Sequence, residues 1–152
     1  MRFSVIICTY NREKYIAASL RAVCLQTFTD TNFELLMVDN NSPDNTKAVF
    51  DTIAAEYPEV QMRYILETEQ GISYAATGGN KRGWGGEYIV FIDDDETIDD
   101  FYLEKLDNYL TAYSEAQLAL RPYCRYMRRV SRSGCLTLPK GLLQDIIIKV
   151  IK

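Results

Sequence analysis

Three consecutive aspartates, Asp93, Asp94 and Asp95, are the residues of this sequence best suited to chemistry. Neighbouring like charges repel, so such a cluster is favourable only where a positive group offsets it. Dense carboxylate oxygens suit a hard divalent cation, Mg²⁺ or Mn²⁺, which keeps bound waters and also binds substrate phosphates. The alternative interpretation is a solvated acidic loop that caps the next helix.

The acidic triplet directly follows a short apolar run, Tyr88 to Ile92, which is rich in β-branched and aromatic residues. Such a run is typical of a strand that is buried on both faces of a parallel sheet. Ligands of open α/β sheets bind at the carboxyl ends of the strands. The sequence therefore predicts that the triplet lies at a ligand-binding edge.

Two other predicted strands, Phe3 to Cys8 and Phe33 to Val38, also end in polar residues. The first is followed by Thr9 to Arg12, and the second by Asp39 and a turn-forming segment. In a parallel sheet all three ends share one edge, where a nucleotide can bind. The Asp39 carboxylate could accept the N–H of a uracil ring, or it could cap the turn that follows. The two common glycine-rich phosphate loops are absent, so we expect phosphate binding mainly through the cation.

Helical periodicity and turn residues predict the elements between these strands. The predicted helices cover about residues 13–25, 45–57 and 100–114, with Asp99 as a cap for the last one, and weaker helical content covers residues 72–81. A further strand at 61–66 is expected near an edge. The predicted fold is α/β, an open, mostly parallel twisted sheet with helices on both faces.

Composition limits the classes of function. The chain has 152 residues, 47% hydrophobic and 25% charged, which is typical of a soluble globular protein. It contains no histidine and no CxxC pair among its four cysteines, which disfavours a zinc site of the usual spacing and excludes a histidine base. We expect Cys8 and Cys24 in the core. Without an export signal or a membrane-spanning run, a cytoplasmic location is expected.

The balance of charged residues changes from acidic to basic near Leu118. Residues 1–118 have 9 Lys and Arg against 20 Asp and Glu, whereas residues 119–152 have 8 against 1. Lys140 to Lys152 is amphipathic. One interpretation is a basic helix that contacts anionic lipid at the inner face of the membrane. The alternatives are a helix or strand that packs on the sheet, or the start of a fold interrupted at Lys152.

Four segments, in this order, resemble glycosyltransferase family 2, which has the GT-A fold. They are Ser4 to Arg12, Val38 to Thr46, Gly71 to Ala75 and Gly86 to Asp95. The resemblance covers about residues 3 to 113 and implies a nucleotide-sugar-binding domain. Together with the change in charge it predicts this domain over residues 1–118, followed by a basic, amphipathic segment over 119–152. It implies a metal-dependent, inverting transfer from a nucleotide-sugar donor, such as a UDP-sugar, to a carbohydrate or lipid-linked acceptor, with no nucleic-acid partner. By this resemblance, the nucleotide would be bound by Thr9, Tyr10, Asn11, Asp39, Asn41, Asp93 and Asp94. A Mn²⁺ or Mg²⁺ ion would be bound by Asp95 and Asp93 of a DXD motif.

The sequence departs from the family in ways that bear on activity. Ala76 stands where many members have an arginine that helps to hold the donor, and no proline follows the acidic cluster. An inverting transfer needs a carboxylate base, but Asp145 is the only acid after Glu115. We therefore expect the acceptor-binding half, and its base, beyond the matched region. The alternative is a truncated, catalytically inactive nucleotide-binding fragment. A phospho-accepting switch domain is disfavoured because no lysine follows a predicted strand.

Overall fold

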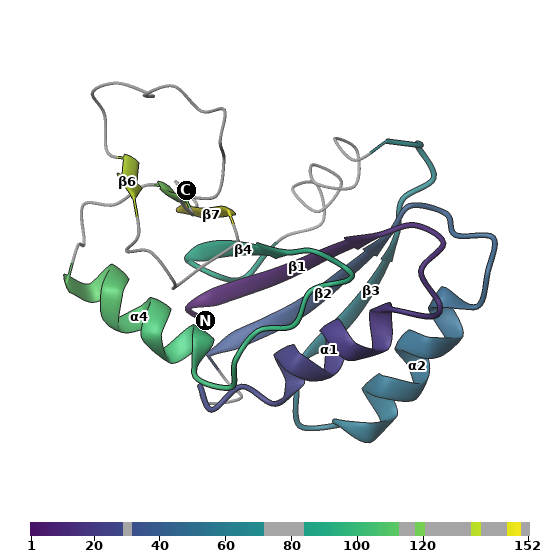
Figure 1. The fold of residues 1–152 in the computed structure, drawn as a ribbon, viewed down its shortest axis with the longest axis horizontal. Helices are drawn as coiled ribbons and strands as arrows, with labels where there is room; N and C mark the ends of the chain where they lie inside the picture. The colour runs from purple at the N-terminus through teal and green to yellow at the C-terminus, as the bar shows by residue number, and fades with distance from the viewer. Residues whose placement is uncertain (29–31, 72–83, 113–117, 121–134, 138–145, 150–152) are drawn as a thin grey trace.

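The centre of the structure is a parallel sheet whose strands alternate with helices along the chain (Figure 1). The computed structural model describes residues 1–28, 32–71, 84–112, 118–120, 135–137 and 146–149. Its parallel strands are β1 (Phe3–Thr9), β2 (Phe33–Asp39), β3 (Met62–Leu66) and β4 (Tyr88–Ile92), in the order β3-β2-β1-β4. This arrangement confirms the predicted open parallel sheet and aligns the carboxyl ends of its strands along one edge.

The register places the three polar strand ends side by side. Thr9 at the end of β1 is opposite Asp39 at the end of β2. On the other side of β1, Ile7 is opposite Ile92, the last residue of β4. The acidic triplet therefore leaves the sheet beside the end of β1, as predicted.

Three short strands extend the sheet beyond β4. They are β5 (Leu118–Leu120), β6 (Cys135–Thr137) and β7 (Ile146–Lys149), and the full order is β3-β2-β1-β4-β7-β5-β6. β7 runs antiparallel to β4, with Tyr88 opposite Lys149. Part of the amphipathic segment at 140–152 is thus a strand of the sheet rather than a helix, and the rest of it lies outside the described residues.

The described helices are α1 (Ile16–Cys24), α2 (Thr46–Glu56) and α4 (Tyr102–Ala112). All three pack on the same side of the sheet (Figure 1). Their apolar side chains join alternate residues of β1, β2 and β4 in one buried cluster. The other face has a smaller cluster that includes Ile6, Leu36 and Ile89, with Trp84 packed against it. The helix predicted at 72–81 lies outside the described residues.

The start of β4 is fixed by a buried polar contact on that second face. The Glu34 side chain is 1% exposed and accepts hydrogen bonds from the Ser4 hydroxyl (2.7 Å) and the Gly85 amide (2.7 Å). The amide of Gly86 donates to Ser4 Oγ at 3.0 Å. A Cβ atom on Gly86 would lie 2.4 Å from the Ser4 nitrogen and 2.5 Å from the carbonyl carbon of Phe3. Only glycine fits where the chain enters β4.

Helix α4 begins at Tyr102, two residues after the predicted start. Asp99 caps the N-terminus of α4, as expected. Its Oδ1 accepts hydrogen bonds from the Phe101 amide at 3.1 Å and from the Lys105 ammonium at 2.7 Å. A carboxylate near a helix N-terminus is favourable because the first amides there lack partners within the helix. Among the described residues, no helix is both long enough and apolar enough to cross a membrane.

Candidate functional site

A pocket of about 450 Å³ opens at the carboxyl ends of β1, β2 and β4. It is lined by Cys8, Thr9, Tyr10, Arg12, Asn40, Gln70, Gly71, Asp93 and Asp94. Four of these residues, Thr9, Tyr10, Asp93 and Asp94, belong to the site predicted from the sequence. The pocket joins the end of β2 to the acidic triplet across β1, which is the arrangement expected of a site for an elongated, negatively charged ligand.

Thr9 provides a polar group at the floor of this pocket. It is 3% exposed, and its Oγ1 atom has no hydrogen-bond partner of good geometry among the described residues. A buried hydroxyl without a partner is unfavourable by about 1–3 kcal/mol, so a ligand that bonds to it is stabilised. This hydroxyl lies near the Asp94 carboxyl, where burial raises the pKa and the hydroxyl opposes part of that rise.

The members of the acidic triplet differ in whether they line the pocket. Asp93, which is exposed, and Asp94, which is half-buried, are part of the lining, whereas the exposed Asp95 is not. Burial raises the pKa of Asp94, the Thr9 hydroxyl and the Arg12 guanidinium oppose this rise, and Asp95 and Asp93 add to it. Arg12 Nε lies 3.5 Å from Asp94 Oδ1. Negative charge is therefore in excess at this end of the pocket.

These carboxylates fit a hard divalent cation. Two adjacent acids line the pocket at the place where charge is in excess. Within the described parts of the chain, no group of three acidic, cysteine or histidine side chains is placed to hold a metal ion. Mg²⁺ and Mn²⁺ sites that bind phosphate commonly use one or two carboxylates, with water and the phosphate supplying the other ligands. Asp93 and Asp94 would hold the ion, and the predicted role of Asp95 as a metal ligand stays a prediction.

Asp39, the predicted acceptor for a base, has other hydrogen-bond partners in the structure. Its side chain is 2% exposed and is not among the residues that line the pocket. Oδ1 accepts hydrogen bonds from the Ser42 amide (2.9 Å) and hydroxyl (2.5 Å), and Oδ2 accepts one from the Tyr64 hydroxyl (2.6 Å). Burial raises the pKa of Tyr64, and this bond adds to the effect. The geometry supports the alternative that Asp39 stabilises the turn after β2.

The next residue, Asn40, takes the position in the pocket lining that we expected for Asp39. It is 6% exposed, and its Nδ2 donates to the carbonyl oxygens of Glu67 (3.2 Å) and Glu69 (2.7 Å). Its Oδ1 accepts the Gly71 amide at 2.8 Å. Asn40 thus holds the loop that forms the far wall. Neither Asn40 nor Gln70 was among the predicted site residues, although Asn40 lies within the segment Val38 to Thr46 and Gln70 directly precedes Gly71.

Two asparagines shape the loops around the pocket. Asn11 and Asn41 have φ angles of 57° and 63°, a left-handed conformation that asparagine tolerates better than most residues. The amide of Asn11 donates to Ser42 Oγ at 2.9 Å, which links the loops after β1 and β2. Neither asparagine is part of the pocket lining, whereas the residue before each of them, Tyr10 and Asn40, is. Their predicted contact with a nucleotide stays a prediction.

Cys8 corrects a further expectation. Cys24 is buried, as predicted, but Cys8 is only half-buried and lines the pocket. Burial raises the pKa of Cys8 to about 11, and the nearby charges of Asp94 and Asp93 add to the effect. The thiol is therefore neutral at neutral pH.

We expect Cys8 to be alkylated slowly despite its partial exposure, because only the thiolate reacts. Near pH 7 its reaction with iodoacetamide should be roughly 100-fold slower than in the unfolded chain. The rate should rise about tenfold per pH unit up to a pH of about 11. Peptide-resolved mass spectrometry measures this rate, and Asp93→Asn should increase it. Rapid labelling near pH 7 would show that burial and the neighbouring aspartates do not raise the pKa of Cys8 in this way.

A parallel sheet with an acidic pocket at its carboxyl edge is typical of α/β proteins that bind ligands at the ends of their strands. The family model for glycosyl transferase family 2 matches residues 4–140. The chain belongs to this family, and the predicted GT-A fold is confirmed by its structural neighbours.

Among curated proteins, the glycosyltransferase AglE of Haloferax volcanii is 34% identical over 102 residues, which are 67% of this chain and 33% of AglE. The poly(ribitol-phosphate) beta-N-acetylglucosaminyltransferase TarS of Staphylococcus aureus is 33% identical over 103 residues, 64% of this chain and 17% of TarS. The chain therefore spans a third or less of the length of these two relatives.

Solved structures share the fold. The structure of S. aureus TarS 1-349 in complex with UDP-GlcNAc superposes with a TM-score of 0.70 at 25% identity, over 85% of this chain and 37% of that one. The mannosyltransferase PcManGT from Pyrobaculum calidifontis, in complex with GDP-Man and Mn²⁺, gives a TM-score of 0.72 at 25% identity. That match covers 78% of this chain and 34% of PcManGT.

Proposed function

We propose that this chain binds the nucleotide-sugar donor of a metal-dependent, inverting glycosyl transfer. One observation carries the proposal: a single pocket brings the buried hydroxyl of Thr9 together with the carboxylates of Asp93 and Asp94. A nucleoside diphosphate has both kinds of group that such a pocket needs, because its ribose can hydrogen-bond and its diphosphate can share a cation. The relatives support this, since related structures contain UDP-GlcNAc, or GDP-Man with Mn²⁺.

The pocket suggests how the ligand would lie. Asn40, Gln70 and Gly71 form one end, where the base would bind, and Tyr10 is 50% exposed at the rim. The diphosphate would lie toward Asp93 and Asp94 at the other end, together with Mn²⁺ or Mg²⁺. When bound, that ion would supply charge compensation for the departing diphosphate. Arg12 also lines this end and would add a second positive charge.

Transfer also requires an acceptor and a base, and we propose that the base comes from outside residues 1–118. Asp145 is the only acid after Glu115. A carbohydrate or a lipid-linked carbohydrate is the proposed acceptor, as in a pathway of polysaccharide biosynthesis. The five arginines between Arg121 and Arg132 suit an anionic membrane surface, which would place the protein on the cytoplasmic side.

Calorimetry with UDP and Mn²⁺ tests the binding site. We expect UDP to bind only weakly without Mn²⁺, and Asp94→Asn to weaken binding of UDP with Mn²⁺ by about 100-fold, because it removes a carboxylate that holds the ion. Asp51→Asn is the matched control, since that exposed acid pairs with Lys47 on α2, away from the pocket. Asp95→Asn shows whether the exposed third acid also contributes. Equal binding by Asp94→Asn and the parent would contradict the proposal.

A second function, donor binding without transfer, is favoured by the shortage of acids after Glu115. An assay of sugar release from UDP-GlcNAc in the presence of Mn²⁺ separates the two. Release above the level of the Asp94→Asn variant supports a transferase. Tight binding of UDP with Mn²⁺ but no release supports a binding fragment.

A further inference from the structure

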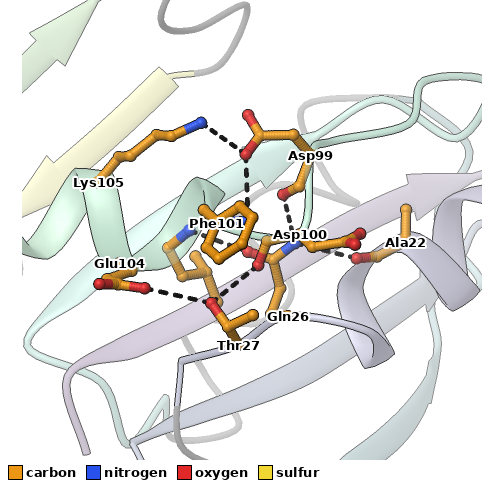
Figure 2. A network of polar contacts seen from close by, with 9 residues as sticks. Ala22, Gln26, Thr27, Asp99, Asp100, Phe101, Glu104 and Lys105 are labelled. Carbon is orange, nitrogen blue, oxygen red and sulfur yellow. Dashed lines mark hydrogen bonds and ion pairs between the residues drawn. The ribbon is translucent and has the colours of Figure 1, made fainter.

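The loop that carries the acidic triplet is anchored at its far end by one buried side chain, Gln26. This residue follows α1 and is 6% exposed. Its Nε2 donates to the carbonyl oxygens of Ala22 (3.1 Å) and Asp99 (2.8 Å), and its Oε1 accepts the Leu103 amide at 2.9 Å. Figure 2 shows Gln26 between Ala22 and the segment that begins at Asp99. The amide therefore uses both of its donors and its acceptor.

These contacts require a carboxamide. Ala22 is in the last turn of α1, where carbonyl groups lack helical partners, and Leu103 is in the first turn of α4, where amides lack them. Gln26 satisfies one group at each helix end and a carbonyl of the loop between β4 and α4. A carboxylate has no hydrogen to donate, and an apolar side chain satisfies none of the three groups.

Thr27 reinforces the same anchor. Its amide donates to the Asp100 carbonyl at 2.8 Å, and its hydroxyl lies 3.2 Å from that oxygen and 3.3 Å from the Glu104 carboxylate (Figure 2). The near end of the loop is fixed differently, by the parallel pairing of β4 with β1. The triplet at 93–95 thus lies on a span that is held by the sheet at one end and by Gln26 and Thr27 at the other.

We propose that Gln26 is a positioning residue for the cation and diphosphate end of the pocket, an inference that rests on the proposed function. Gln26 does not line the pocket. It acts through the path of residues 93–101, which determines where the carboxylates of Asp93 and Asp94 stand relative to Thr9. The Asn40 end of the pocket is built from the loop after β3 and does not depend on this anchor.

The test compares two ligands in the same variants. Gln26→Glu keeps the acceptor for Leu103 but places a carboxylate against two carbonyl oxygens, and Gln26→Met removes all three bonds. Both should bind UDP with Mn²⁺ about tenfold more weakly by calorimetry. Both should bind uridine, which lacks phosphate, within about twofold of the parent by nuclear magnetic resonance titration. Ile53→Val in the core of α2 is the control for general loss of stability, which weakens both ligands equally or neither.

The outcomes separate the two proposals. A parent protein that binds no UDP with Mn²⁺ refutes the proposed function, and this inference with it. A parent that binds, with Gln26 variants that match it, refutes the inference alone. An equal loss of affinity for both ligands also refutes the inference, because Gln26 would then only stabilise the fold. If Gln26→Met does not fold, Thr27→Val tests the same anchor. It should weaken the binding of UDP with Mn²⁺ by about two- to threefold and leave the binding of uridine unchanged. An unchanged affinity for UDP with Mn²⁺ would contradict the role of the anchor.

Discussion

Gly86→Ala is expected to destabilise the protein by about 3 kcal/mol or more, because overpacking against rigid groups has a high cost. The added Cβ would lie 2.4 Å from the Ser4 nitrogen and 2.5 Å from the Phe3 carbonyl carbon, both backbone atoms of the central strand. Neither can move without disturbing the pairing of β1 with β2 and β4. Urea denaturation followed by circular dichroism measures the loss.

The neighbouring glycine is a matched control. A Cβ on Gly85 would meet only side-chain atoms, Glu34 Oε1 and Met1 Sδ, each at 3.3 Å, and no backbone atom. Gly85→Ala should therefore change the free energy of unfolding by less than about 1 kcal/mol. Similar losses for both variants would mean that the entry to β4 is not limited by the approach of backbone to backbone.

Asp39→Ala is expected to reduce the free energy of unfolding by about 3 kcal/mol, whether or not a nucleotide is present. It leaves the amide and hydroxyl of Ser42 and the hydroxyl of Tyr64 without their shared acceptor. Hydrogen bonds to a charged group contribute about 1.5–3 kcal/mol each, and orphaned partners add to the loss. Thermal and urea unfolding of the ligand-free protein measure the effect.

Tyr64→Phe tests the same contact from the other side. It removes only the hydroxyl bond to Asp39 and should reproduce roughly half of the loss, about 1.5 kcal/mol. Tyr64 packs against Phe50 and is not part of the pocket lining, so its effect cannot come from a contact with a base. If Asp39→Ala weakened UDP binding without any loss of stability, Asp39 would instead be a direct ligand of the nucleotide, as the sequence alone suggested.

The sequence predicted the strands and their polar ends because parallel strands have a plain signature. Tyr88 to Ile92 is a continuous apolar run that stops at charged residues, and its observed bounds match the predicted ones. The family motifs follow the same strand ends, so the fold and the edge where the pocket lies could both be predicted. Four of the nine pocket residues were found in this way.

Side-chain directions could not be predicted in the same way. β2 is buried on both faces, so no alternation of polar and apolar residues shows which face each residue meets. The structure places Leu35, Met37 and Asp39 on the helix-covered face. There the Asp39 carboxylate accepts hydrogen bonds from the hydroxyls of Ser42 and Tyr64. Asn40 was missed because its role depends on a loop about 30 residues away. Gln26 was missed because its partners at residues 99 and 103 are more than 70 residues away.

The central place of β1 has a consequence for how the protein is made. β1 is synthesised before the other described strands, yet Phe3 can pair with its second neighbour only after Tyr88 has been synthesised. Until then the nascent chain exposes one unpaired apolar edge, which invites association with other chains. The pocket is also completed late, because its acidic residues are synthesised after the ends of β1 and β2. Chaperone capture during translation should therefore peak before residue 92 emerges.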